Sequence, residues 1–183
     1  MVPVPKHDGS IRICGDFKLT VNPVLKAEEY PLPLIEDIFS KLSGGTHFTV
    51  TDLAKAYHQM EIEEESRKYV TLNTPKGLYQ YNHLVFGIKS ATYIWQRAMD
   101  QVLQGLEGTQ CYLDDILITG RTAAEHRKNL ENVLSGLQKF GLRENRAKCT
   151  FFQPSVSYLK YALDRNGLNK APDKNRAVVE ATR

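Results

Sequence analysis

The segment Cys111-Tyr112-Leu113-Asp114-Asp115-Ile116-Leu117-Ile118 sets two adjacent carboxylates inside an apolar, strand-forming run. This pattern is typical of two short strands joined by a tight turn, with the acids at its tip. Two neighbouring aspartates in an apolar setting are costly, because like charges repel and burial removes their hydration. A divalent cation removes that cost, and Mg²⁺ prefers carboxylate, phosphate and water oxygens. We therefore interpret Asp114 and Asp115 as half of a metal site.

The alternative is that the Asp-Asp pair is an ordinary turn that binds nothing. Turn aspartates usually stand among Gly, Asn, Ser or Pro. Here Tyr112 and Leu113 come before the pair and Ile116 follows it. These flanking residues favour the metal site over the turn.

A third carboxylate is expected from Asp52, which lies near the end of a strand predicted over residues 47–53. The small residues after it and the aromatic Tyr57 make it a candidate ligand. The competing interpretation is a strand-end turn residue. Helices and short strands alternate without a parallel βαβ rhythm, which predicts an α+β fold with helices packed on one face of a small antiparallel sheet. That sheet would hold Asp52 and the Asp114-Asp115 turn on adjacent strands.

Composition sets wide bounds on the function. The chain has 183 residues, 42% of them hydrophobic, and a net charge of +3, which fits one folded domain and permits a polyanionic partner. Three widely separated cysteines match neither a zinc site nor a disulfide framework, so we expect reduced thiols. No signal peptide or membrane-spanning run is evident, and we expect a soluble, intracellular protein with no membrane partner.

Other elements follow from local patterns. Asp8-Gly9 between alternating segments predicts a hairpin from which Lys6 and Arg12 project, either toward phosphate oxygens or simply into solvent. The remaining predictions are a helix over 34–42, strands over 69–74 and 78–82, a helix from Ser90 through Leu103, a helix opened by Thr122 and Glu125 and ending near Gly141, and a strand over 156–163.

Six segments stand in a fixed order along the chain. They are Val2 to Phe17, Tyr30-Pro31-Leu32-Pro33, Asp52 to Gln59, Tyr81 to Gly87, Tyr112-Leu113-Asp114-Asp115, and Gly141-Leu142 with Lys148-Cys149. In this order they resemble the reverse transcriptases of gypsy-type long-terminal-repeat retrotransposons over nearly the whole chain. The resemblance implies a right-hand polymerase fold, with fingers at 1–45 and 62–92, palm at 46–61 and 93–165, a truncated thumb starting at 166–183, and the rest of the thumb missing.

The resemblance also assigns roles in catalysis. Asp52 matches the family's first catalytic aspartate, and Asp114 and Asp115 match its YxDD pair. Together with Leu53 they would hold two Mg²⁺ ions, with Mn²⁺ as a substitute, one ion activating the primer 3′-hydroxyl and the other steadying the triphosphate. Lys148 matches the lysine proposed to protonate the pyrophosphate leaving group, although it could be a solvated surface residue.

The implied partners are an RNA or DNA template with its primer and deoxynucleoside triphosphates. Lys6 and Arg12 match residues that grip the triphosphate, and Tyr57 matches an aromatic gate that crowds a ribose 2′-hydroxyl, or is a core residue. The nucleotide-binding residues implied in this way are Lys6, Arg12, Leu53, Ala54, Lys55, Ala56, Tyr57, Phe86 and Gly87, with the amides of residues 53–56 directed at phosphates.

Four positions depart from the family pattern. Val85 and Thr92 replace prolines, which we expect to loosen a template-side loop. Lys160 replaces glycine and Tyr161 replaces histidine in the hairpin that holds the primer end, where a side chain would displace the primer. The alternative function is therefore a dead or co-opted remnant that at most binds nucleic acid. A different two-metal nucleotidyltransferase is a third reading, and it would make the Lys6 and Arg12 segment a coincidence.

Overall fold

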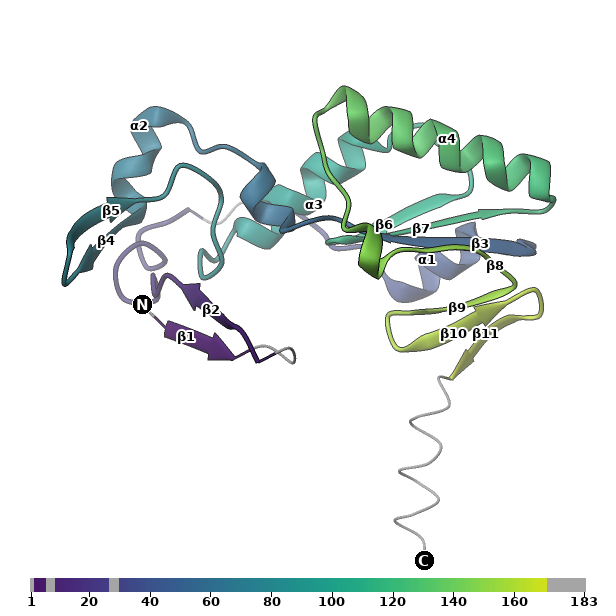
Figure 1. Cartoon of the computed structure of the whole chain (residues 1–183), viewed down its shortest axis with the longest axis horizontal. Helices are drawn as coiled ribbons and strands as arrows, with labels where there is room; N and C mark the ends of the chain where they lie inside the picture. The colour runs from purple at the N-terminus through teal and green to yellow at the C-terminus, as the bar shows by residue number, and fades with distance from the viewer. Residues whose placement is uncertain (1, 6–8, 27–29, 171–183) are drawn as a thin grey trace, which may run out of the picture. The chain divides into compact units, whose positions relative to one another are not determined.

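The computed structural model describes residues 2–5, 9–26 and 30–170 (Figure 1). Lys6 and the segment 171–183 of the expected thumb lie outside the described residues. The elements in chain order are β1 Val2–Pro5, β2 Ile11–Cys14, α1 Ile35–Lys41, β3 His47–Asp52, η1 Ala56–Gln59, α2 Glu64–Arg67, η2 Lys68–Val70, β4 Thr71–Thr74, β5 Gly77–Gln80, α3 Ala91–Val102, β6 Thr109–Tyr112, β7 Asp115–Gly120, α4 Ala123–Lys139, η3 Arg146–Lys148, β8 Thr150–Gln153, β9 Ser155–Tyr158, β10 Tyr161–Asp164 and β11 Gly167–Lys170.

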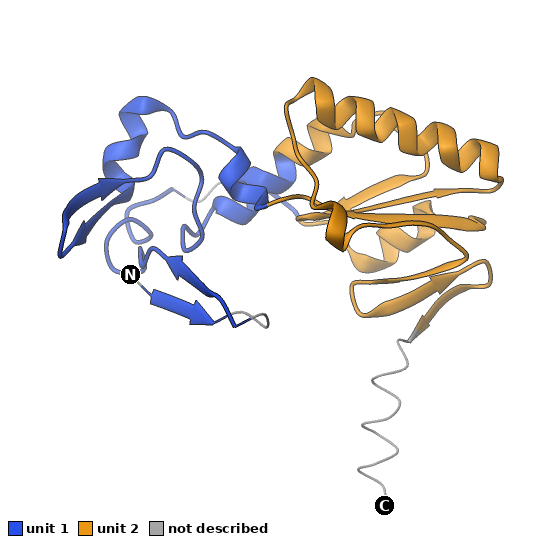
Figure 2. Cartoon of the chain, viewed as in Figure 1, with its two compact units in different colours: residues 1–31, 55–97 blue, residues 32–54, 98–183 orange. Residues whose placement is uncertain are grey.

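Two compact units divide the chain (Figure 2). The first unit contains residues 1–31 and 55–97, and the second contains residues 32–54 and 98–183. The chain therefore passes between the units three times, after Pro31, after Ala54 and within α3. The assignment of fingers and palm stays a prediction, and the bounds of the compact units differ from it at residues 32–45, 55–61 and 93–97. Residues 32–45 belong to the second unit because the apolar side of α1 packs into that unit's core.

The second unit is built on a four-stranded antiparallel sheet in the order β6-β7-β3-β8. β3 and β7 pair along their whole length, from His47 opposite Gly120 to Asp52 opposite Asp115. This confirms that Asp52 and the acidic turn lie on adjacent strands.

Helix α4 covers one face of this sheet, and α1 with the small sheet β11-β10-β9 covers the other (Figure 1). Successive side chains of β7 point to opposite faces of the sheet, so this one strand packs on both sides. Leu117 joins the cluster on the α1 face, while the buried Ile116 and Ile118 point to the opposite face. The cluster on the α1 face contains Ile38, Phe39, Leu42, Phe48, Leu117, Val156, Tyr158 and Leu163.

The first unit is smaller and carries the hairpins β1-β2 and β4-β5. Its core cluster consists of Phe17, Val70 and Val85, and the partly buried Leu72 of β4 packs against this cluster. Val85, one of the departures from the family pattern, is thus a buried core residue.

The architecture confirms an α+β fold, and three more detailed predictions were wrong. Helices were expected on one face of the sheet, but α1 packs on the face opposite α4, because successive side chains of the strands alternate between the faces and leave both apolar. The strand expected over 156–163 is a hairpin of β9 and β10, because Leu159 and Lys160 form a turn with φ of 50° and 67°. The helix expected over 34–42, with Leu34 in its apolar stripe, is α1 at Ile35–Lys41; Leu34 precedes it in extended backbone and its side chain is exposed. In the described part of the chain, none of the helices has both the length and the apolar composition needed to cross a bilayer.

Candidate active site

Three acidic residues lie at one end of the central sheet of the second unit. Asp52 is the last residue of β3 and stands opposite Asp115, the first residue of β7. Asp114 lies in the turn between β6 and β7, and its carbonyl accepts a hydrogen bond of 2.8 Å from the Leu53 amide. This main-chain hydrogen bond links the end of β3 to the turn between β6 and β7. The prediction of a hairpin with acids at its tip is confirmed.

The turn itself is a strained conformation. Leu113 has φ of 56°, in the left-handed region that leucine rarely adopts. The thiol of Cys111 donates to the Leu113 carbonyl at 3.3 Å, which helps to hold this backbone in place. Strained residues of this kind are held by the structure around them, and they concentrate at functional sites.

The electrostatics of the acids are unfavourable in the absence of a cation. Burial raises the pKa of Asp115 from 3.8 to about 6, with further contributions from the charges of Asp114 and then Asp52, while Lys148 acts in the opposite direction. Asp115 therefore interacts electrostatically with both other carboxylates. A site that accumulates negative charge in this way fits a divalent cation, because the cation would offset the repulsion.

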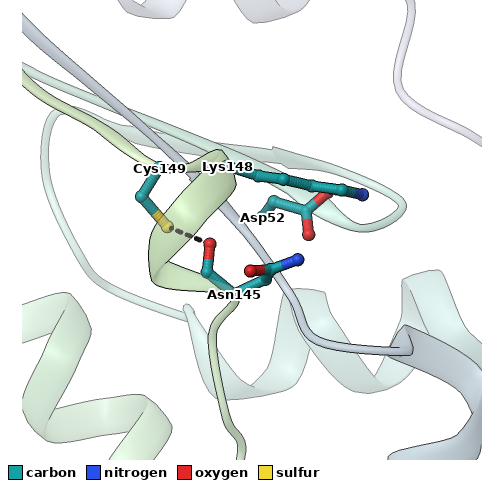
Figure 3. A network of polar contacts seen from close by, with 4 residues as sticks. All are labelled: Asp52, Asn145, Lys148 and Cys149. Atoms are coloured by element: carbon teal, nitrogen blue, oxygen red, sulfur yellow. Dashed lines mark hydrogen bonds and ion pairs between the residues drawn. The ribbon is translucent and has the colours of Figure 1, made fainter. Parts of the chain in front are cut away.

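The position of Lys148 is set by the segment that follows α4. The Asn145 amide donates to the Asp52 carbonyl at 2.8 Å, and the Lys148 amide donates back to the Asn145 carbonyl at 2.9 Å. The Cys149 thiol also donates to the Asn145 carbonyl, at 3.2 Å (Figure 3). These bonds fix η3 beside the end of β3.

The Lys148 side chain makes an ion pair with Asp52, with 3.0 Å between Nζ and Oδ2 (Figure 3). The Asp52 side chain is only 16% exposed, whereas that of Lys148 is 64% exposed. A largely exposed lysine can leave the ion pair at small cost. Lys148 thus places a largely exposed cation beside the acids, and its predicted role at the leaving group stays a prediction.

A supporting residue of the acidic site was missed by the sequence analysis. The buried Tyr158 of β9 donates its hydroxyl to the Asp115 carbonyl at 3.1 Å. Burial raises the pKa of Tyr158 well above its usual value, so it remains a neutral donor. A tyrosine in a strand carries no signal in the sequence for a partner 43 residues away.

The carboxylates of Asp52, Asp114 and Asp115 have the charge and the oxygen donors that suit a divalent metal. Their side chains are too far apart in this structure to bind one ion together. Within residues 2–5, 9–26 and 30–170, no three His, Cys, Asp or Glu side chains are grouped closely enough to hold an ion. Asp52, Asp114 and Asp115, with the Leu53 carbonyl, would have to close on it. Reverse transcriptases in general depend on divalent metals.

The prediction that the amides of Leu53 and Ala54 bind phosphates is wrong. The Leu53 amide is bonded to the Asp114 carbonyl, and the Ala54 amide is bonded to the Arg143 carbonyl at 2.9 Å. Lys55 and Ala56 remain as candidates for that role. Lys55 has φ of 57° and caps η1, so the backbone bends sharply at this point.

A second group of predicted residues gathers around Phe86 within the first unit. The Arg12 guanidinium lies 4.7 Å from the centre of the Phe86 ring, and the Tyr57 ring lies 4.8 Å from it. His58, which was not predicted, contacts the same ring with 5.7 Å between centroids. Its pKa is lowered by burial and then by the charges of His83, Lys55 and Arg12.

Gly87 is required by the backbone. Its φ is +96°, and a Cβ at this position would approach the Gly15 carbonyl oxygen to 2.5 Å. Asn22 fastens the same loop, donating to the Gly87 carbonyl at 2.8 Å and accepting from the Lys89 amide at 2.9 Å. Gly87 thus supports the loop that presents Phe86, and its predicted contact with a nucleotide stays a prediction.

These observations agree with sequence comparison. The family described as "Reverse transcriptase (RNA-dependent DNA polymerase)" matches residues 4–163. The chain belongs to the reverse transcriptase family. The recognition made from the sequence motifs is confirmed at this level, and the gypsy-type subgroup stays a prediction.

Similar curated proteins are much longer than this chain. An uncharacterized protein, K02A2.6, of Caenorhabditis elegans is 38% identical over 174 residues, covering 94% of this chain and 14% of that protein. The transposon Tf2-3 polyprotein of Schizosaccharomyces pombe is 32% identical over 179 residues, covering 97% of this chain and 13% of the polyprotein. The chain thus spans about one seventh of the relatives it matches.

Solved structures share the fold. A foamy viral protease-reverse transcriptase in complex with double-stranded DNA matches with a TM-score of 0.90 at 20% identity, over 96% of this chain and 31% of that chain. The foamy viral enzyme in complex with an RNA/DNA hybrid matches with a TM-score of 0.85 at 19% identity, over 96% of this chain and 24% of that chain. These likenesses confirm the right-hand polymerase fold.

Proposed function

We propose that this chain is the fingers and palm of an RNA-directed DNA polymerase from a retrotransposon polyprotein. It would add deoxynucleotides to a primer paired with an RNA or DNA template. The observation that carries the proposal is the pairing of Asp52 with Asp115 across β3 and β7, with Asp114 in the adjoining turn and Lys148 on Asp52. The foamy viral relatives were solved with nucleic acid, which supports a primer-template as the partner.

The proposed reaction is an in-line displacement at phosphorus. The 3′-hydroxyl of the primer loses its proton to water, and its oxygen forms a bond to the α-phosphorus of a deoxynucleoside triphosphate, while the bond from that phosphorus to the pyrophosphate oxygen breaks. Two Mg²⁺ ions, when bound, would activate the hydroxyl and neutralise the developing charge. Asp52, Asp114 and Asp115 would hold them, with the Leu53 carbonyl as a further ligand.

Lys148 would supply the proton that the leaving pyrophosphate takes up. Its exposed ammonium group is within hydrogen-bond distance of Asp52, so it lies beside the residue assigned to the metal site. General acids of this kind contribute about 10²- to 10⁴-fold to a rate. Arg12 would bind the triphosphate, and Tyr57 would crowd a 2′-hydroxyl and thereby reject ribonucleotides.

Primer extension on RNA and DNA templates tests the proposal. We expect the purified chain to extend a primer in Mg²⁺ or Mn²⁺, and Asp115→Asn to reduce the rate by about 10³-fold, since it removes a ligand of the cations that would neutralise the developing charge. Asp164→Asn is the matched control. It removes a carboxylate of the same unit whose oxygen accepts from the Asn166 amide, a role that asparagine can also fill.

Two results would refute the proposal. Equal extension by the Asp115→Asn and Asp164→Asn variants would remove the acidic site from the chemistry. No extension by any variant, including the unmodified chain in its folded state, would favour the remnant that at most binds nucleic acid.

A further inference from the structure

Thr92 makes a contact with the proposed gate residue that the family resemblance did not predict. Its Oγ1 lies 3.1 Å from the hydroxyl oxygen of Tyr57, within hydrogen-bond distance. Thr92 was interpreted from the sequence only as a missing proline that loosens a loop. The structure instead gives it a polar partner 35 residues away in the chain.

Helix α3 presents two residues to the Tyr57 side chain. Thr92 and Trp95 are three positions apart and so lie on the same side of the helix. Thr92 contacts the hydroxyl, and the buried Trp95 meets the ring edge to face, with 6.0 Å between centroids and 60° between planes. The same stretch of helix thus holds both the tip and the body of Tyr57.

Phe86 provides a further aromatic contact, with its ring centre 4.8 Å from that of Tyr57 and the planes tilted by 39°. The Tyr57 side chain is only 8% exposed. Aromatic contacts restrict where the ring plane lies, but they are tolerant of sliding within that plane. A hydrogen bond at the tip is directional and sets the position along the ring axis.

We propose that Thr92 is a positioning residue for sugar selection, holding the Tyr57 hydroxyl so that the ring stands at the depth where it rejects a ribose 2′-hydroxyl. This inference rests on the proposed polymerase function. Selection by steric conflict depends steeply on distance, so a small displacement of the ring weakens the rejection of ribonucleotides more than it changes the acceptance of deoxynucleotides.

Single-nucleotide incorporation tests this role in variants that change one group each. Thr92→Val replaces the hydroxyl with a methyl group of similar size, and Thr92→Ser keeps the hydroxyl. The readout is the ratio of kcat/KM for a deoxynucleotide to that for the ribonucleotide with the same base. We expect Thr92→Val to lower this ratio roughly three- to tenfold, the range of one lost hydrogen bond, and Thr92→Ser to keep the ratio of the unmodified chain.

Removing the other partner of the bond provides the second test. Tyr57→Phe keeps the ring and loses the hydroxyl, so it should lower the ratio as far as Thr92→Val does. The double variant should be no worse than either single variant, because both remove the same interaction.

The results distinguish this inference from the proposed function. An active Thr92→Val variant with an unchanged ratio, or one in which both kcat/KM values fall in the same proportion, would overturn the positioning role and leave the polymerase intact. An unmodified chain that incorporates no nucleotide would overturn the proposed function, and the positioning role with it.

Discussion

At the scale of single residues, the acidic site owes its properties to the environment of Asp115. The carboxyl group is half-buried and faces the charges of Asp114 and Asp52, and these influences together raise its pKa to about 6. Between about pH 4 and pH 6 the folded chain therefore keeps a proton on Asp115 that the unfolded chain has already released. In that pH range, a cation that binds at this site must displace the proton.

This predicts a pH-dependent stability for the metal-free chain. The pKa of Asp115 in the folded chain lies above its unfolded value of 3.8. Protonation of Asp115 therefore stabilises the folded chain fully below pH 3.8, and this stabilisation is lost as the pH rises through about 6. In EDTA, we expect the free energy of unfolding measured with urea to fall between about pH 4 and pH 6 relative to Asp115→Asn, by on the order of 1–3 kcal/mol. A difference between the two chains that does not vary over this range would contradict the assignment.

Some residue roles were open to prediction from the sequence and others were not. The pairing of Asp52 with the acidic turn followed from strand patterns and from the order of motifs. The failure at Leu53 and Ala54 has a physical cause, because the carbonyl groups that occupy their amides belong to Asp114 and Arg143, distant in sequence. Thr92 was noticed only as a departure, since nothing in the sequence specifies which hydroxyl a threonine will meet.

At the scale of elements, turn chemistry separated correct predictions from wrong ones. Helix α4 was recognised from its cap, and the Glu125 amide does donate to the Thr122 hydroxyl oxygen at 3.1 Å. The local pattern missed the turn between β9 and β10, although the family resemblance implied a hairpin there. Leu159 and Lys160 are not residues that favour a left-handed turn, yet both have positive φ. A sequence without Gly, Asn or Asp there looks like one continuous strand.

The same turn makes a prediction about stability. Lys160 has φ of 67° and an exposed side chain, so glycine can replace it without losing packing. We expect Lys160→Gly to increase the free energy of unfolding by about 1 kcal/mol, because the left-handed region costs a side-chain-bearing residue about that much. Urea denaturation would measure it, with Lys160→Ala as the control that keeps a Cβ. Equal stability of the glycine and alanine variants would show that this turn stores no strain.

At the scale of the whole molecule, two interleaved units share one chain. The second unit carries the three acids and Lys148, and the first carries Arg12, Phe86, Tyr57 and Thr92. The resemblance to a polymerase family predicted interleaved fingers and palm, but with bounds that differ from those of the two compact units. That division depends on how α1 packs against β3, β7, β9 and β10, a tertiary contact that local patterns do not encode.

Binding of Mn²⁺ tests the central claim, that the three acids form a metal site, most directly. Free Mn²⁺ has a strong paramagnetic resonance signal that is lost on binding, so titration of the folded chain gives the amount bound without requiring turnover. We expect saturable binding by the unmodified chain and by Asp164→Asn, and a loss of about tenfold or more in affinity in Asp115→Asn, where one carboxylate ligand is gone. Binding that is unaffected by Asp115→Asn, or absent from the unmodified chain, would contradict the account.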